Sequence, residues 1–191
     1  MEEDTGGITA YLQYQSDTVA IFGHWIPGRG EMGNSSAAGL GFNFAVWFPA
    51  GGWEEPAPLV VYLHGGKGNL MELAPYAHLA VPGGLLLTLD DPLQTLLSDT
   101  LVDQNTFWLG YRRGFDRFRP RLPFQDTVML YTARRVWWEV RWVIEHFPVD
   151  TERVSVAGTS MGGMGALLHS QLRPELWSAA LAFVPHLRGL R

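Results

Sequence analysis

The sequence predicts an α/β domain with a mostly parallel sheet. Residues 58–63 form a continuous apolar run, typical of a strand covered on both faces, and residues 84–90 form a second apolar strand candidate. The apolar side chains of residues 136–147 recur at helical spacing, and a third apolar run follows at residues 153–157. Strands that alternate with helices in this way are typical of a parallel sheet flanked by helices.

Alternation, turn residues and proline positions predict the remaining elements: edge strands at 8–22 and 42–48, a short helix at 69–79 and a strand at 179–185. Asp126 and Thr127 can cap the long helix, and Pro148 would end it. The three tryptophans of that helix are expected to pack against the sheet.

Length and composition limit the class of protein. A chain of 191 residues is expected to form one domain, and 47% hydrophobic with 17% charged residues is typical of a folded globular protein. A net charge of −5 gives no general attraction to nucleic acid or to an anionic membrane, and the absence of cysteine excludes disulfides and thiolate metal sites. Residues 1–7 are acidic and lack the features of a secretory signal, so a cytoplasmic location is the default expectation.

The most informative segment is residues 158–163, with the pattern Gly-x-Ser-x-Gly-Gly. The pattern alone arises by chance in a chain with 22 glycines, but here an apolar strand precedes it and a helix-permissive stretch follows. Gly158 and Gly162 allow a tight turn that places Ser160 at the start of a helix. The amide of Met161 and the helix dipole can then stabilise negative charge, which predicts that Ser160 is a nucleophile.

A second glycine motif, His64-Gly65-Gly66, follows the strand at residues 58–63. Its glycines allow backbone amides to approach a substrate oxygen, so Gly65 and Gly66 are predicted to form an oxyanion hole with Met161. The alternative is an ordinary glycine turn. His64 is expected to shape this loop rather than to move protons, and Lys67 is expected to be a solvated loop lysine.

Together the two motifs resemble those of the α/β-hydrolase superfamily. The likeness is to the esterase branch that includes polyhydroxybutyrate-depolymerase-like and prolyl-oligopeptidase-like serine hydrolases, and it runs from about Phe42 to Pro185. It implies an α/β-hydrolase-like three-layer sandwich, truncated after the strand that follows the nucleophile helix. Residues 1–41 would supply N-terminal edge strands and a loop, and residues 42–191 would form the partial hydrolase domain.

The implied activity is hydrolysis of a carboxylic ester through an acyl-enzyme on Ser160, with no metal and no cofactor. The expected partner is a small-molecule ester, not a nucleic acid or a membrane. Trp108 and Tyr111 lie in a region that shapes the pocket in this superfamily, so they are candidates for substrate binding. The equally weighted alternative makes both of them core anchors of a long loop.

The histidine and the acid of the family pattern are missing from their usual places. In this superfamily both residues follow the serine, on two further strand–helix units that would need roughly 60 residues. Only 31 residues of this sequence follow Ser160. His169 lies nine positions along the nucleophile helix, roughly 13 Å from its start, and is expected to point elsewhere. His186 follows the last strand and is the candidate base that remains, while Glu175 is the only acid after Ser160.

Three hypotheses remain open. The favoured one is the N-terminal part of a serine esterase, completed by a missing C-terminal segment or a second chain. The second is a catalytically degenerate binding or scaffold module, and the third is a minimal hydrolase that uses His186. A serine peptidase is a further alternative for the reaction. The apolar edge strand at residues 179–184 distinguishes the first two hypotheses, because an unpaired apolar edge promotes aggregation. The first predicts that the chain alone is poorly soluble or is rescued by a second chain, and the second predicts a soluble monomer.

Overall fold

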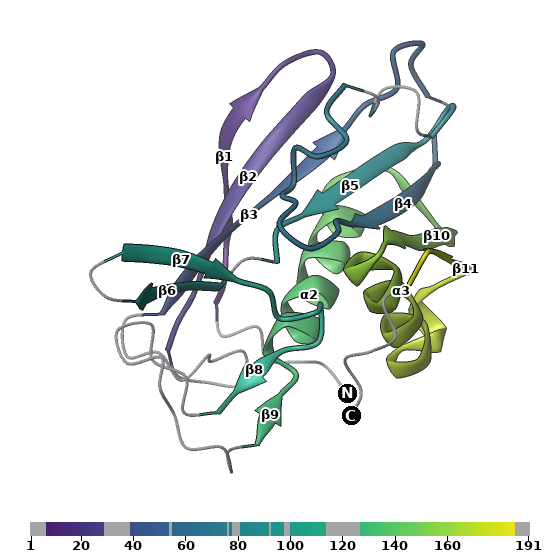
Figure 1. Cartoon of the computed structure of the whole chain (residues 1–191). Coiled ribbons are helices and arrows are strands. Elements are labelled where there is room, and N and C mark those ends of the chain that lie inside the picture. Colours follow the sequence, from purple (N-terminus) through teal and green to yellow (C-terminus); the bar gives the residue numbers. More distant parts are fainter. Residues whose placement is uncertain are drawn as a thin grey trace.

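The computed structural model describes residues 7–28, 39–53, 55–75, 77, 81–91, 93–97, 100–113 and 127–185 (Figure 1). Within them, seven strands form one sheet in the order β1-β2-β3-β5-β4-β10-β11. These strands are β1 (Ala10–Gln15), β2 (Val19–Ile26), β3 (Leu40–Trp47), β4 (Ala57–Leu63), β5 (Leu85–Leu89), β10 (Val149–Thr159) and β11 (Ala179–Phe183). The half from β5 to β11 is parallel, and the half from β1 to β5 is antiparallel. The predicted α/β fold is confirmed, with a sheet that is parallel where the two glycine motifs lie.

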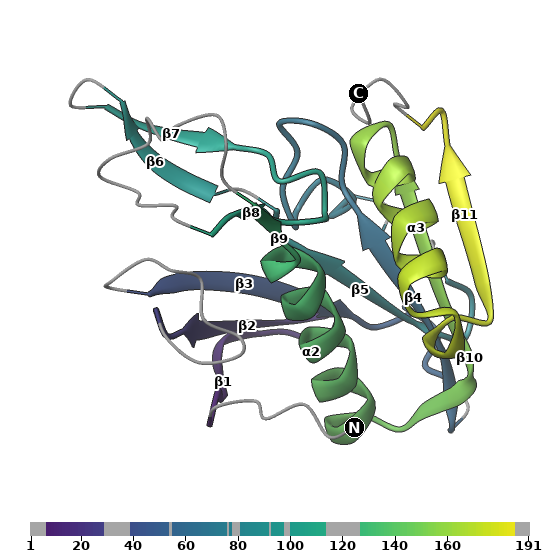
Figure 2. The same cartoon turned by 90° about the horizontal axis from the view of Figure 1, so that it is seen from below.

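Two helices cover one face of this sheet (Figure 2). They are α2 (Tyr131–His146) and α3 (Met161–Leu172), with the short 3-10 helix η1 (Pro174–Leu176) after α3. Leu59, Val61 and Leu63 of β4 belong to the core cluster that both helices share. The alternate side chains Val60 and Tyr62 belong to a second cluster on the other face, together with Leu70, Ala77 and Val81 from the segment after β4. Alternation along a strand buried on both faces explains this division.

The N-terminal strands are part of the same sheet as the rest of the chain. β2 pairs with β3 from Val19↔Trp47 to Ile26↔Leu40, so the sheet is continuous across the boundary expected at residue 41. That boundary falls inside β3, and the two halves share one core.

The long helix begins later than predicted. α2 starts at Tyr131 after Leu130, which makes no side-chain cap hydrogen bond, so the expected cap at Thr127 is wrong. The reason is a short strand, β9 (Val128–Met129), which pairs with β8 (Tyr111–Arg112) and occupies the residues before the helix. Asp126 lies outside the described residues. The predicted end before Pro148 is confirmed, since α2 ends at His146.

The three tryptophans of α2 pack as predicted: Trp137 and Trp138 are buried, and Trp142 is packed against the core. Residues 70–75 form turns and Ala77 is helical, so within the described residues the predicted helix at 69–79 is present only at Ala77. β6 (Leu93–Leu97) and β7 (Thr100–Gln104) form a separate hairpin, and β11 lies at one edge of the sheet.

Candidate active site

Ser160 is the single residue between β10 and α3. Its backbone has φ 55° and ψ −112°, a conformation that costs free energy for any residue other than glycine. Two hydrogen bonds hold it there: the Ser160 amide donates to the Phe183 carbonyl (2.9 Å), and the Ser160 carbonyl accepts from the Met164 amide (3.1 Å). The predicted strand–serine–helix turn is therefore confirmed, and Ser160 stands at the N-terminus of α3.

The glycines around Ser160 are required by contact with backbone. A Cβ on Gly158 would overlap the backbone of Gly162, and a Cβ on Gly162 would overlap the carbonyl of Leu63 at the end of β4. A Cβ on Gly163 would lie 2.9 Å from the Phe183 carbonyl oxygen. The turn thus lies directly against the ends of β4 and β11, which leaves no space for side chains.

The loop after β4 lies beside the serine. A Cβ added to Gly65 would be 3.9 Å from the Cβ of Ser160 and 3.5 Å from the Thr159 carbonyl oxygen. On Gly66, the added Cβ would be 3.7 Å from the side-chain nitrogen of Asn105, an exposed residue that sequence reasoning did not select. The structure therefore brings the two glycine motifs together at the carboxyl ends of neighbouring parallel strands.

His64 shapes this loop, as its position in the sequence suggested. Its Nδ1–H donates to the Gly65 carbonyl (2.7 Å), and its Nε2 accepts from the Asp91 amide (3.1 Å). The pKa of His64 is lowered, mainly by burial, so the neutral ring is favoured. The two hydrogen bonds need this neutral ring, because one nitrogen donates and the other accepts.

Trp108 and Tyr111 are both buried in the main core. The Trp108 indole donates to the His64 carbonyl (3.1 Å), and its own carbonyl accepts from Nε2 of His169 (3.0 Å). The Tyr111 ring lies 4.9 Å from the Tyr131 ring. These surroundings match the core-anchor alternative more closely than a wall of a substrate pocket.

His169 does not face Ser160. It is fully buried, accepts from the Trp137 indole at Nδ1 (3.0 Å) and donates to Trp108 at Nε2. Burial lowers the pKa of His169 to about 4, so the ring is neutral and both nitrogens are occupied. His186, the candidate base of the sequence analysis, lies outside the described residues.

Asp91 is a site residue that the sequence analysis missed. It follows β5, is buried, and its carboxylate accepts from the amide (2.8 Å) and the hydroxyl of Thr106. Desolvation by burial raises the pKa of Asp91 to about 6, although the bonds from Thr106 and the nearby Arg135 oppose the shift. Its position immediately after an apolar strand, at the sheet edge that carries the site, is the signal that could have identified it.

We expect Asp91 and His169 to give opposite pH dependences of stability. The raised pKa of Asp91 means that its stabilising contribution is present below pH 4 and lost as the pH rises to about 6. The lowered pKa of His169 means that its contribution is present above pH 6.5 and lost as the pH falls to about 4. Each shift of about two pKa units is worth about 3 kcal/mol, so the two slopes oppose each other in the wild-type chain.

Urea unfolding between pH 4 and 6.5 tests this expectation. Relative to wild type, the unfolding free energy of Asp91→Asn should rise with pH, and that of His169→Gln should fall. Three parallel pH profiles would contradict the assignment of these two groups.

The described residues contain no group of three or more metal-ligating side chains, and no helix among them is long and apolar enough to span a membrane.

The sequence of this chain is similar to those of known esterases and hydrolases. A family described as putative esterase matches residues 140–189, which include the Ser160 turn. The S-formylglutathione hydrolase of Paracoccus denitrificans (strain Pd 1222) is 27% identical over 159 residues, covering 79% of this chain and 54% of the relative. The chain spans about half the length of the curated relatives it matches.

Solved structures agree in fold. An S-formylglutathione hydrolase from Agrobacterium tumefaciens has a TM-score of 0.59 at 22% identity, covering 93% of this chain and 62% of that one. An acetyl xylan esterase from Paenibacillus sp. R4 has a TM-score of 0.56 at 21% identity, covering 95% and 54%. The chain therefore has an α/β-hydrolase-like fold, and its sequence is similar to a family of putative esterases and to S-formylglutathione hydrolases.

Proposed function

We propose that this chain carries the nucleophile and the oxyanion donors of a serine hydrolase that cleaves carboxylic esters. The conformation of Ser160 is the observation that supports this most strongly. A non-glycine residue at φ 55° is costly, and such strain concentrates at functional sites. Here it places the serine at a helix N-terminus, next to the Gly65 loop.

The reaction would proceed through an acyl-enzyme. A base takes the hydroxyl proton of Ser160 as Oγ attacks the ester carbonyl, and it passes this proton to the alcohol that leaves when the tetrahedral intermediate collapses. Water then attacks the acyl-enzyme, which releases the acid and returns the proton to Ser160. The amide of Met161, with those of Gly65 or Gly66, would hold the oxyanion, aided by the dipole of α3. Removing one such donor typically costs about 10²–10³ in turnover.

Ser160 also needs a base. We propose His186 as the candidate on this chain, because it follows β11, whose Phe183 carbonyl already accepts from the Ser160 amide. The competing proposal is that a further segment or a second chain supplies the histidine and its acid.

The substrate proposal comes from the relatives. One relative is named for hydrolysis of S-formylglutathione and another for acetyl xylan, so both names specify a short acyl group. We propose a short-chain acyl ester or thioester for this chain, with Ser160 as the acyl acceptor.

A fluorophosphonate probe with intact-mass readout tests the proposal. We expect one adduct on the wild-type chain, none on Ser160→Ala, and an undiminished adduct on Ser170→Ala, a control serine on α3. Loss of labelling in His186→Ala would assign the base. Labelling only after a C-terminal segment or partner chain is added would favour the split-enzyme alternative, and a folded chain that never labels would favour the scaffold hypothesis.

A further inference from the structure

The carbonyls of the Gly65 loop are each held by a hydrogen-bond donor. The Trp108 indole donates to the His64 carbonyl (3.1 Å). The Gly65 carbonyl accepts from Nδ1 of His64 (2.7 Å) and from the Gly68 amide (3.0 Å). In a planar trans peptide the N–H points opposite to the C=O. Holding the His64 carbonyl therefore sets the direction of the Gly65 N–H, and holding the Gly65 carbonyl sets that of the Gly66 N–H.

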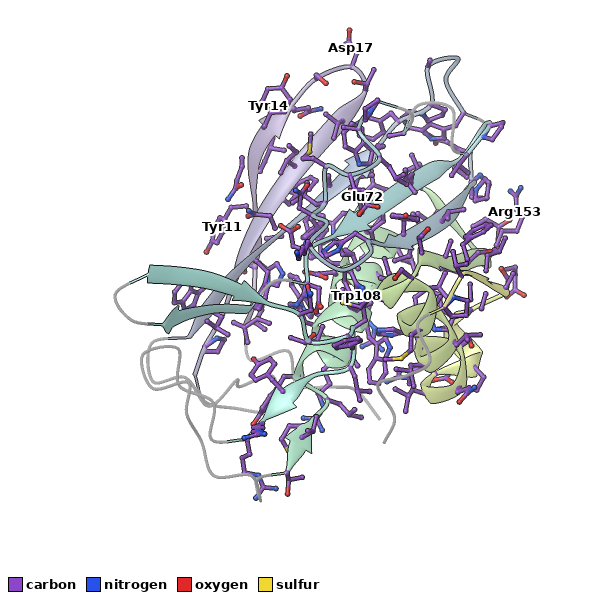
Figure 3. All side chains as sticks on the ribbon, in the orientation of Figure 1. Tyr11, Tyr14, Asp17, Glu72, Trp108 and Arg153 are labelled. Atoms are coloured by element: carbon purple, nitrogen blue, oxygen red, sulfur yellow. The ribbon has the colours of Figure 1, made fainter. Side chains whose placement is uncertain are left out.

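Trp108, labelled in Figure 3, is itself held by contacts with α3, the helix that starts at Ser160. Its carbonyl accepts from His169 of α3, whose other ring nitrogen accepts from Trp137. Its side chain lies against Gly165, one helical turn before His169, where an added Cβ would be 2.7 Å from the Cβ of Trp108. Trp108 therefore connects the helix that starts at Ser160 to the loop that lies beside it.

The backbone of Trp108 shows that its position is constrained. Phe107 and Trp108 have φ values of 55° and 61°, two successive left-handed residues that are not glycine. Asp91 holds the start of this turn through Thr106, and the Asp91 amide also donates to His64. Such a conformation persists only where its surroundings over-determine it, and here those surroundings are the parts of the proposed site.

We infer that Trp108 is a positioning residue, which aims the Gly65 amide at the oxyanion by holding the His64 carbonyl at a fixed distance from α3. This inference rests on the proposed function. Oxyanion donors act because they are oriented before the reaction begins, so a freed peptide would lose rate without losing substrate affinity. Trp108 does not contact the reacting atoms, and its effect passes through one peptide group.

Trp108→Phe removes the indole donor and keeps an aromatic ring. We expect it to lower the rate of fluorophosphonate labelling, and the kcat for a short acyl ester, by about tenfold or more, with KM unchanged. The matched control is Trp47→Phe, which also deletes a buried indole bond, made to the Thr88 hydroxyl (2.9 Å) between β3 and β5. It should lose stability and keep its rate. Equal rates in the two variants would overturn the inference.

Two measurements decide the question without any activity. In Trp108→Phe, the residual dipolar coupling of the Gly65 N–H should change while those of β10 stay as in wild type; an unchanged Gly65 coupling would overturn the inference. In the wild-type chain, the Trp108 indole hydrogen should exchange far more slowly than that of the exposed Trp25. Equal exchange would overturn it even if Trp108→Phe does not fold. Failure of the proposed function appears separately, as a wild-type chain that does not label.

Discussion

Replacing Gly162 with alanine is expected to unfold the chain or to cost at least about 4 kcal/mol, the upper range for single substitutions. Gly162 lies in the first turn of α3, where helix propensity alone would favour alanine by about 1 kcal/mol. The added Cβ would overlap the carbonyl of Leu63, which is backbone of the central strand β4 and cannot rotate away. The steric term therefore exceeds the propensity term, and α3 would have to move away from the sheet.

Far-UV circular dichroism and urea unfolding measure this effect. Gly51→Ala is the matched control, because a Cβ there meets no atom within 4 Å and the backbone conformation is not left-handed. It should leave the unfolding midpoint nearly unchanged. A folded Gly162→Ala chain with wild-type stability would contradict the close approach of the Ser160 turn to β4.

The contrast between Gly162 and Trp108 shows which parts of the site the sequence could predict. The glycines at 158 and 162 are needed by a turn of a few residues, so their spacing around Ser160 is a local pattern. The hydrogen bond from Trp108 to His64 joins residues 44 positions apart. Nothing in the residues near Trp108 indicates its partner, so the core role and the pocket role remained equally open.

The same distinction applies to the fold. Apolar runs predicted β4, β5 and the second half of β10, because a strand covered on both faces must be apolar whichever strands neighbour it. The apolar run of β11 was also predicted as a strand, but it lies at the sheet edge with most of its side chains exposed. The start of α2 was missed because β9 pairs with β8, and that pairing depends on tertiary contacts rather than on a capping residue. Asp91 was missed for a related reason, since its partner Thr106 lies beyond the β6–β7 hairpin.

Replacing Glu139 with glutamine is expected to cost about 3–5 kcal/mol, the range for breaking a buried ion pair. Glu139 is fully buried and accepts two bonds from Arg135 (2.8 and 3.0 Å) and one from Nε2 of His24 (2.7 Å). Arg135 is equally buried and also donates to the Asp90 carbonyl, at the end of β5. Glutamine keeps the shape of the side chain but removes the carboxylate that binds the guanidinium, which leaves Asp91 as the nearby counter-charge in a medium of low dielectric constant.

Urea unfolding of Glu139→Gln, compared with an apolar replacement of the whole cluster, separates charge from packing. The triple variant His24→Phe/Arg135→Met/Glu139→Leu should be more stable than the single one, because well-packed apolar groups carry no desolvation cost. Phe42, Phe44 and Trp138 already surround the His24 ring and can receive a phenyl group. A single variant that loses under 1 kcal/mol would mean that water reaches Arg135 in the folded state. The network would then not hold α2 to β2 and to the end of β5, where the Asp91 framework of the site begins.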